Sequence, residues 1–372
     1  MNLSYWEQKS WFSNVDHTIV GSGIVGLSTA LHLKKRFPKA KILILECGLL
    51  PQGASTKNAG FACFGSISEL IDDLNSHSAQ EMVTLVQKRW EGLQLLRKTL
   101  GDSTIEYQQL GGYELFGHRD KELLENCLNK KNEINGLLKP IFEEDVFEIR
   151  TNAFGFKRIQ PDLFFNKFEG QIDTGKMMVA LLKKAIVNGI MILNNCTVEA
   201  YSENFEDVDV KTDTLQFKTK KLLIATNGFA SQMNIKETQP ARAQVLITKP
   251  IEGLSIKGTF HLDKGYYYFR NIDNRILLGG GRNLDFKGEQ TSKMAQTPLI
   301  QNRLEELLKT TILPNTHFEI DHRWSGIMGV GNLKKPIVKQ VSNNVYCGVR
   351  LGGMGVAIGS IIGEELSRLV DN

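Results

Sequence analysis

Apolar positions along the chain follow two periods, one helical and one alternating, and together they predict an α/β protein. Near the N-terminus, a short apolar strand ending at Val20 precedes a helix, and a second apolar strand follows at 42–45. This order of strand, helix and strand is typical of a parallel sheet covered by helices. Helical spacing of apolar residues predicts further helices over about 66–100, 120–138, 175–185 and 356–370.

Alternating segments are concentrated in a second region, 244–281, which is rich in predicted strands. Two of its strands flank Asn271–Asn274, a turn that predicts a hairpin. Because segments of the two kinds follow each other along the chain, we expect an α/β domain interleaved with a more antiparallel domain. The predicted strands are 105–116, 190–193, 196–201, 215–228, 244–248, 265–270, 275–281 and 344–348.

The first helix follows a glycine-rich turn, Gly21-Ser-Gly-Ile-Val-Gly26. Gly21 permits the tight turn, Gly23 lets the backbone approach a pyrophosphate, and Gly26 lets the helix pack closely on the sheet. Glu46 ends the second strand, at the position along the chain where a carboxylate can accept hydrogen bonds from ribose hydroxyls. The free N–H groups of the helix would meet the pyrophosphate. The pattern favours a dinucleotide site over a plain packed βαβ unit and suits NAD and FAD equally.

Composition and charge narrow the choice of partners. The chain has 372 residues, enough for two domains, with 41% hydrophobic and 23% charged residues. A net charge of +4, with both signs interspersed, predicts no nucleic-acid surface. The longest apolar run falls short of the roughly 18 residues of a membrane span. The N-terminus lacks the basic start and apolar core of a secretory signal.

Cysteine and histidine spacing adds two expectations. The five cysteines are widely spaced and odd in number, which predicts reduced thiols and a cytoplasmic location. The seven histidines are dispersed without metal-ligand spacing, so no metal site is expected. His261 and His322 lie in regions that could face a substrate, although an isolated histidine is more often structural.

Five segments, in this order and spacing, resemble the FAD-dependent amine and amino-acid oxidase family, which contains D-amino-acid oxidase, glycine oxidase and sarcosine oxidase. The likeness covers nearly the whole chain. Gly53–Gly60 and the opening Ser4-Tyr-Trp6 are most similar to the branch with gamma-glutamylputrescine oxidase. The five segments are Gly21–Gly26 with Glu46, Gly53–Gly60, Ile224–Gly228, Tyr268–Arg270 before Leu277–Gly280, and Gly348–Val356.

The resemblance implies a Rossmann-like FAD-binding domain interleaved with a substrate domain built on an antiparallel sheet. The FAD-binding domain is expected at 1–90, 165–235 and 322–372. The substrate domain is expected at 91–164 and 236–321.

The resemblance also implies a non-covalent FAD site, because no cysteine stands where sarcosine oxidase attaches its flavin. The loop 352–355 leads into a helix whose N–H groups can stabilise negative charge on the reduced flavin. Val198 matches a position whose backbone contacts adenine, and Gly228 would let the main chain approach the pyrophosphate. The residues expected to bind FAD are Gly21, Gly23, Ile24, Val25, Gly26, Glu46, Cys47, Gly53, Ala54, Ser55, Asn58, Ala59, Gly60, Val198, Thr226, Asn227, Gly228, Gly326, Gly352, Gly353, Met354, Gly355 and Val356.

Substrate handling would fall to a small set of cationic and aromatic side chains. A bidentate guanidinium suits a substrate carboxylate and would fix the reacting carbon near flavin N5. A tyrosine could line the cavity, and a lysine could place a cation near the flavin. The arginine candidates are Arg270, Arg350 and Arg323, the tyrosine is Tyr268, and the lysine is Lys57.

The activity implied by the resemblance is oxidation of a C–N bond in an amine or amino acid. Hydride would pass to flavin N5, water would hydrolyse the imine, and oxygen or another acceptor would reoxidise the flavin. The alternative is a flavin-dependent dehydrogenase acting on the C–OH bond of a hydroxy acid, which needs a base that the sequence does not reveal. A non-catalytic dinucleotide sensor is disfavoured by the second domain and the flavin-facing helix.

Overall fold

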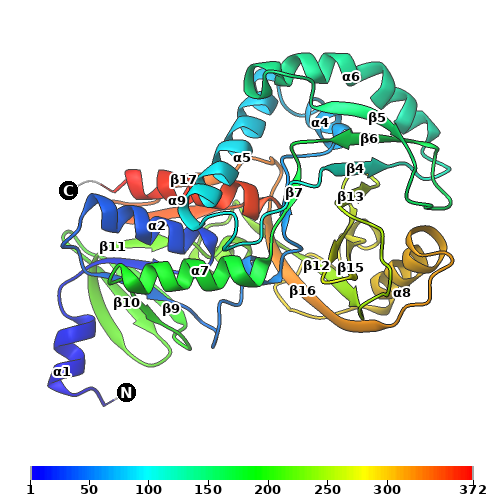
Figure 1. The fold of residues 1–372 in the computed structure, drawn as a ribbon. Helices are drawn as coiled ribbons and strands as arrows, with labels where there is room; N and C mark the ends of the chain where they lie inside the picture. Colours follow the sequence, from blue (N-terminus) through cyan, green and yellow to red (C-terminus); the bar gives the residue numbers. More distant parts are fainter. Residues whose placement is uncertain (1, 371–372) are drawn as a thin grey trace.

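The protein folds into two lobes, each built on an eight-stranded sheet, in a computed structural model that describes residues 2–370 (Figure 1). Met1, Asp371 and Asn372, which the prediction placed in the FAD-binding domain, lie outside the described residues. The predicted class is confirmed: a Rossmann-like α/β unit is interleaved with an antiparallel sheet.

The first sheet is mostly parallel, with the N-terminal strand β1 near its centre. Its order is β17-β18-β11-β1-β2-β8, and β10 and β9 continue from β11 as an antiparallel ribbon. β1 pairs in parallel with β2 and β11, so Val20, Leu45 and Ile224 end neighbouring strands at one edge. The strands are β1 (Val15–Val20), β2 (Ile42–Leu45), β8 (Met191–Leu193), β9 (Val198–Glu203), β10 (Val208–Thr212), β11 (Gln216–Ile224), β17 (Ile337–Gln340) and β18 (Val345–Val349).

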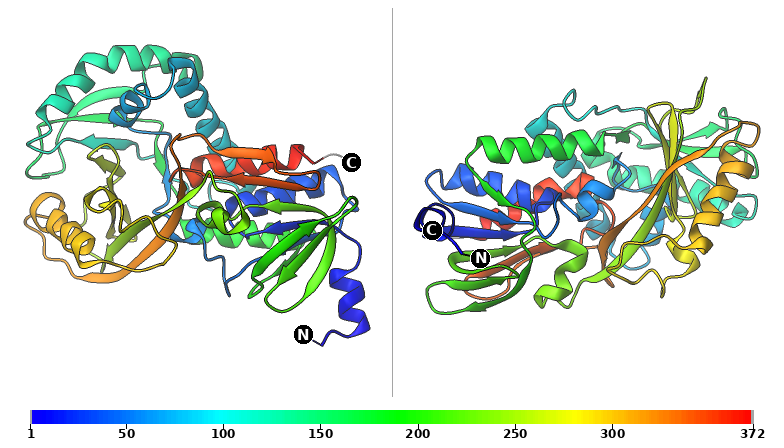
Figure 2. Two further views of the ribbon diagram at one scale, coloured as in Figure 1. Left: turned by 180° about the vertical axis from the view of Figure 1, so that it is seen from behind. Right: turned by 90° about the horizontal axis from the view of Figure 1, so that it is seen from below.

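Helices cover one face of this sheet, and the β9–β10 ribbon lies toward the other (Figure 2). α2 (Ile24–Arg36) packs against both α7 (Thr174–Val187) and α9 (Gly355–Arg368). The central strands are buried on both faces, which explains why they read as continuous apolar runs. α2 and α9 approach closely at Gly363, where a Cβ atom would lie 2.5 Å from the Cβ of Ser28.

The second sheet is antiparallel except where β13 pairs with β4. One face packs on α8 (Pro298–Leu307), and α6 (Lys121–Phe142) packs beside β5 and β6. The predicted hairpin is confirmed, with Asp273 and Asn274 at positive φ between β14 and β15. The strand order is β16 (Ile320–Val330), β12 (Gln239–Thr248), β15 (Arg275–Gly280), β14 (Tyr267–Ile272), β13 (Thr259–Leu262), β4 (Gly112–Leu115), β6 (Asp162–Asn166) and β5 (Phe147–Thr151).

The prediction of one long helix over 66–100 is wrong, because the structure has two helices there. α4 (Ile67–Asp73) ends before α5 (Ala79–Leu100) begins. Ser78 caps α5, and Glu81 completes a capping box with it. The apolar spacing continues across the break, whereas the capping residues fix a new N-terminus. The strands predicted over 105–116 reduce to β4, and the sequence analysis did not predict β13, β16 or α8.

The domain boundary predicted at residue 322 falls inside β16. This strand pairs with β12 from Ile320 to Val330, including the pair His322 and Ile247. Continuous strand pairing places the whole of β16 in the antiparallel sheet, so the chain returns to the first lobe only after Val330.

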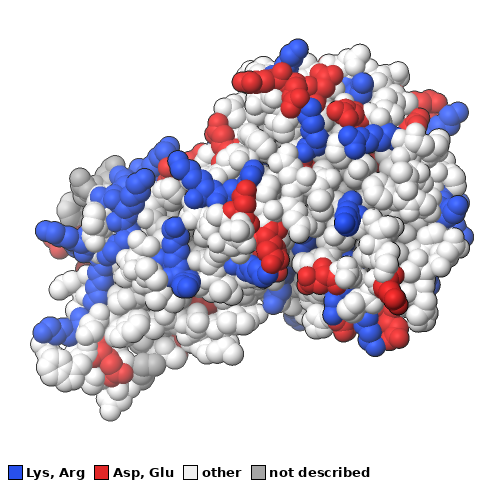
Figure 3. Space-filling model, in the orientation of Figure 1, with Lys and Arg blue, Asp and Glu red and all other residues white. Residues whose placement is uncertain are grey.

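Surface charge is mixed on the face drawn in Figure 3, where basic and acidic side chains occur on both lobes. In the described part of the chain, no helix combines the length and the apolar character needed to cross a membrane.

Candidate active site

A cavity of about 560 Å³ lies between the two lobes and is lined by residues of both. Its size is typical of small-molecule and cofactor sites. Five predicted site residues do not line it: Gly26, Gly60, Gly228, Arg270 and Arg350. The predicted residues that do line it are Gly21, Gly23, Ile24, Val25, Glu46, Cys47, Gly53, Ala54, Ser55, Lys57, Asn58, Ala59, Val198, Thr226, Asn227, Tyr268, Gly326, Gly352, Gly353, Met354, Gly355 and Val356.

The glycine turn opens the N-terminus of α2 toward this cavity. Gly21 has φ of 102°, a conformation that side chains rarely adopt. A Cβ atom on Gly26 would lie 1.9 Å from the Gly21 carbonyl oxygen, so Gly26 brings helix and turn together without lining the cavity. Ser55 accepts a hydrogen bond of 3.0 Å from the Ile24 N–H, which joins the 53–60 loop to the helix start.

Glu46 lies at the end of β2 and is buried beside the turn. One carboxylate oxygen accepts hydrogen bonds from the backbone N–H and hydroxyl of Ser22, at 3.0 and 2.8 Å. The other accepts backbone N–H groups of Gly48 and Gln52, both at 3.2 Å. These bonds fix the carboxylate in the cavity wall that Val198 also lines, where it can receive ribose hydroxyls.

The Gly53–Gly60 segment forms a short helix, α3 (Ala54–Lys57), and a turn closed by Asn58. The Asn58 side-chain oxygen accepts the Gly60 N–H at 2.8 Å and the Thr174 hydroxyl at 2.9 Å. The Lys57 carbonyl accepts the indole N–H of Trp324 at 2.9 Å, which ties the segment to β16. Asn58 therefore shapes the loop, while Lys57 lies in the wall of the cavity.

The opposite wall is the glycine turn before α9. Gly352 and Gly353 have φ of 60° and 85°, and the turn leads into α9, whose first residues Gly355 and Val356 line the cavity. Asn227 holds this turn, because its side-chain oxygen accepts the N–H groups of Arg350 and Leu351, each at 3.1 Å. The neighbouring hydroxyl of Thr226 is buried and has no partner among residues 2–370.

Two other glycines serve packing. A Cβ atom on Gly228 would lie 2.5 Å from the Met328 carbonyl oxygen, so its close contact is with β16. The expectation that Gly228 admits a pyrophosphate is not supported by this geometry. Gly326 lines the cavity, and a side chain there would meet the Cβ of Lys57 at 2.8 Å.

None of the three arginine candidates lines the main cavity. Arg270 is 2% exposed and faces a second cavity of about 180 Å³, together with Asp173 and Asp273. Burial lowers the pKa of Arg270 to about 10, although the two aspartates oppose that shift. Arg270 lies two residues beyond Tyr268 on β14, and its guanidinium packs behind Gly60.

The other two arginines have structural partners. Arg350 donates to the carbonyl oxygens of Lys335 and Glu237, at 2.8 and 3.3 Å. Arg323 pairs with Glu305 of α8 at 2.8 Å. Arg350 therefore supports the glycine turn from outside, and Arg323 anchors α8 to β16.

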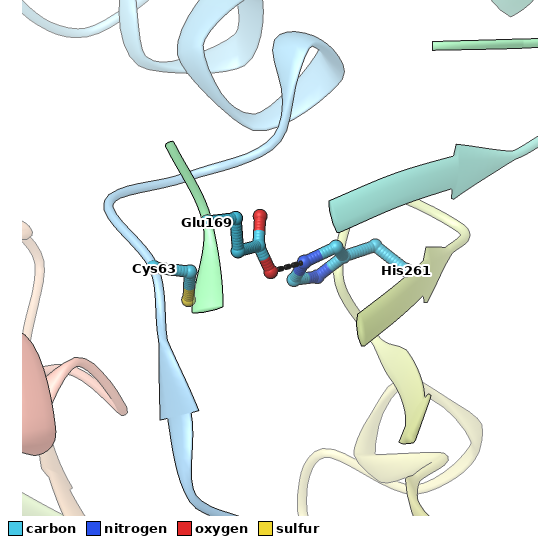
Figure 4. A group of neighbouring side chains, drawn as sticks. All are labelled: Cys63, Glu169 and His261. Carbon is cyan, nitrogen blue, oxygen red and sulfur yellow. Dashed lines mark hydrogen bonds and ion pairs between the residues drawn. The ribbon is translucent and has the colours of Figure 1, made fainter. Parts of the chain in front are cut away.

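The substrate-lobe end of the cavity contains a polar cluster that the sequence analysis did not assemble, Cys63, Glu169 and His261 (Figure 4). Nε2 of His261 lies 2.5 Å from Oε1 of Glu169, and both side chains are buried. His261 and Cys63 line the cavity. Cys63 and Glu169 come together because β3 (Phe61–Ala62) pairs with β7 (Gly170–Gln171).

Charged residues form pairs near the cavity wall. Lys264 lies 3.3 Å from Asp72, and Lys334 pairs with the buried Asp73. Both acids belong to α4, whereas the two lysines come from different loops. The pairs fasten those loops to α4.

The site fits FAD. Its backbone-rich turns meet the starts of two helices, a carboxylate that could accept ribose hydroxyls is fixed in the wall, and the unpartnered Thr226 hydroxyl offers a free donor. The fold and this site define a dinucleotide-binding oxidoreductase. Residues 16–369 match the DAO family, described as FAD dependent oxidoreductase, and the chain belongs to this family. The protein is therefore an FAD-dependent enzyme.

Known proteins with similar sequence and structure span nearly the whole chain. Gamma-glutamylputrescine oxidoreductase of Escherichia coli (strain K12) is 23% identical, over 95% of this chain and 83% of its own length. Glycine oxidase from Geobacillus kaustophilus superposes with a TM-score of 0.76 at 17% identity, covering 96% of this chain and 95% of that one. L-proline dehydrogenase from P. horikoshii gives 0.75 at 19% identity, with 96% and 93% covered.

Proposed function

We propose that this enzyme oxidises the C–N bond of a small amine or amino acid to an imine, which water then hydrolyses. When bound, FAD supplies the hydride acceptor at N5 and passes the electrons to oxygen or another acceptor. The names of two similar structures, a glycine oxidase and an L-proline dehydrogenase, support an amino-acid substrate.

The observation that carries this proposal is the buried pair of His261 and Glu169 at the substrate-lobe end. Burial disfavours the charged imidazole, but the charge and hydrogen bond of Glu169 outweigh it and raise the pKa of His261 to about 9. His261 therefore holds its proton at neutral pH. Oxidation of an alcohol needs a base for the hydroxyl proton, whereas a neutral amine needs none for hydride transfer. His261 is therefore not available as the base that C–OH oxidation needs, which supports the C–N reaction.

Other residues would position the substrate. Phe61 and Tyr268 lie edge to face, with ring centroids 5.5 Å apart, and both line the cavity. Burial raises the pKa of Tyr268 to about 12, so its hydroxyl remains a neutral hydrogen-bond donor. Lys57 would place a positive charge in the wall of the same cavity as the α9 turn, where negative charge on the reduced cofactor is stabilised.

We also propose that FAD is held without a covalent bond. Burial raises the pKa of the Cys63 thiol well above its usual range, and nearby carboxylates add to this shift. The thiol therefore remains protonated and unreactive. The cytoplasmic location stays a prediction.

Anaerobic mixing tests the proposed reaction. FAD-loaded enzyme is mixed with a panel of primary and secondary amines, amino acids and the corresponding hydroxy acids, and the absorbance near ~450 nm is followed. Bleaching by an amine or amino acid, but not by its hydroxy analogue, is the expected result. Bleaching by hydroxy acids alone would replace the proposal with the C–OH alternative. Acid denaturation should release FAD into the supernatant, and retention on the precipitated protein would contradict non-covalent binding.

A further inference from the structure

We infer that the second cavity, the one that Arg270 faces, is a binding site for a small zwitterion that is not the substrate. The acidic group of this ligand would lie on Arg270, and its ammonium group would lie toward Gln171 and Asp173. The inference goes beyond the proposed function, because the second cavity shares no lining residue with the cavity that would hold FAD and substrate.

Arg270 is a buried cation without a partner. Its side chain comes from β14, and the residue is 2% exposed. Within residues 2–370, no hydrogen bond or ion pair uses its guanidinium, and its Nε is a buried donor without an acceptor. A guanidinium has five N–H donors, and a buried charge is ordinarily paired. The acceptor that Arg270 needs therefore comes from what fills the cavity.

A second buried atom of the opposite kind lines the same cavity. Oε1 of Gln171 has no donor in the described part of the chain, whereas its side-chain nitrogen donates to Oε1 of Gln108 at 3.1 Å. Gln171 belongs to β7, whose pairing with β3 fixes it in the wall. The cavity thus offers free donors at Arg270 and a free acceptor at Gln171. Its volume of about 180 Å³ has room for a ligand of several heavy atoms.

The charges around the cavity decide which ligand fits. Three carboxylates line it, those of Asp173, Asp273 and Glu106. Lys176 forms an ion pair with Glu106, which leaves two carboxylates and one guanidinium. A simple anion would meet Arg270 but would be repelled by the two aspartates, and a simple cation would leave the guanidinium unpaired. A zwitterion satisfies both ends, because it presents an acceptor to one side and a cation to the other.

Local structure fixes the carboxylate end of this site. Asp173 caps α7, and its Oδ1 accepts the Lys176 N–H at 2.8 Å. Asp273 lies in the turn between β14 and β15, at φ of 48°. Both carboxylates are therefore held by main-chain structure on the side of the cavity that faces solvent, whereas Arg270 and Gln171 form its buried end.

Gly60 is part of the partition between the two cavities. A Cβ atom on Gly60 would lie 2.9 Å from a terminal nitrogen of Arg270 and 2.4 Å from the Ile172 carbonyl oxygen. Its neighbour Ala59 lines the main cavity, whereas Ile172 lines the second. The proposed site therefore lies behind the Gly53–Gly60 loop and is reached without passing through the main cavity.

Calorimetric titration of the FAD-loaded enzyme tests the site with three probes of one shape. 2-Aminoisobutyrate is a zwitterion, pivalate carries only the carboxylate, and tert-butylamine carries only the ammonium. None of them has a hydrogen on the carbon next to nitrogen, so none can give hydride to the flavin. We expect the wild type to bind 2-aminoisobutyrate more tightly than either analogue.

Arg270→Met removes the guanidinium and keeps a chain of similar width. Its Kd for 2-aminoisobutyrate should rise roughly 10- to 100-fold, the loss of a hydrogen-bonded charge. Arg323→Met is the matched control, since Arg323 pairs with Glu305 away from this cavity, and it should bind the zwitterion like the wild type. Arg270→Met should also melt at or above the wild-type temperature without ligand, because it replaces an unpaired buried charge with an apolar side chain.

A second variant tests the other end of the site. Asp173→Asn keeps the cap of α7, because asparagine also caps helices, and removes one negative charge. It should bind 2-aminoisobutyrate more weakly and pivalate more tightly than the wild type does, since the anion then meets one carboxylate fewer.

Four results would overturn the inference. If no probe binds the wild type, the cavity holds water only. If 2-aminoisobutyrate binds wild type and Arg270→Met equally, it occupies the main cavity alone. Tighter wild-type binding of pivalate than of the zwitterion would indicate an anion site. Unchanged binding of both probes in Asp173→Asn would remove the ammonium end. Bleaching of the flavin by amines is a separate readout, so the proposed function stands or falls independently.

Discussion

Replacement of Gly26 by alanine should disrupt the first turn of the cofactor site. The added Cβ would lie 1.9 Å from the Gly21 carbonyl oxygen, where ordinary contacts begin at 3.4 Å, so turn and helix must move apart. The turn cannot retreat, because Gly21 is itself backed by the main chain of Ala225, 3.0 Å from where a Gly21 Cβ would be. Overpacking of this kind costs about 1–3 kcal/mol, and the displaced turn should also bind FAD less tightly.

The assay compares urea unfolding of the apoprotein with the FAD content of protein purified under matched conditions. We expect Gly26→Ala to lower the free energy of unfolding by about 1–3 kcal/mol and to reduce bound FAD. Gly136→Ala is the control, since Gly136 lies in α6 with open space around its Cβ position. That change should stabilise the protein by up to about 1 kcal/mol. Wild-type stability and FAD content in Gly26→Ala would refute the steric argument.

Single side chains supply three further tests. Asn227→Ala leaves two N–H groups of the glycine turn without their acceptor, so the FAD content measured by absorbance should fall. Full retention of FAD would show that the turn keeps its shape without this side chain. Arg270→Met should change the KM of a carboxylate substrate by less than about 2-fold, because Arg270 faces the second cavity. A large rise in KM with kcat unchanged would show that Arg270 binds the substrate carboxylate after all. Burial lowers the pKa of His17 to about 4, so the fold keeps it neutral. The stability that neutral His17 contributes is present above its ordinary pKa of 6.5 and is lost as the pH falls toward 4. The melting temperature of the wild type should therefore fall more between pH 7 and 5 than that of His17→Gln.

Local features of the cofactor turn could be predicted from the sequence because strand, turn, helix and acid follow one another in a single short stretch, from Asp16 to Glu46. In that stretch the spacing alone fixes which backbone groups meet. Gly26 was correctly interpreted as a packing residue, and Glu46 as a carboxylate at the strand end. The same holds for the hairpin at Asp273 and Asn274, where turn chemistry and strand alternation agree.

The substrate end could not be predicted because its residues meet only through strand pairing. His261 and Glu169 are 92 positions apart, and Cys63 reaches them only because β3 pairs with β7. β13, which carries His261, has four residues, too few for an alternating pattern to stand out. For Arg270, the sequence could not show that the side chain packs behind Gly60 and faces the second cavity.

The interleaving of the two lobes has a consequence for how the enzyme matures during synthesis. β1 gains its second neighbour only when β11 has been made, and the wall formed by Gly352–Val356 is made later still. A nascent chain that already contains the first glycine turn and Glu46 still has no complete pocket. The complete cavity therefore exists only once Gly352–Val356 has joined the parts of the wall that were made earlier.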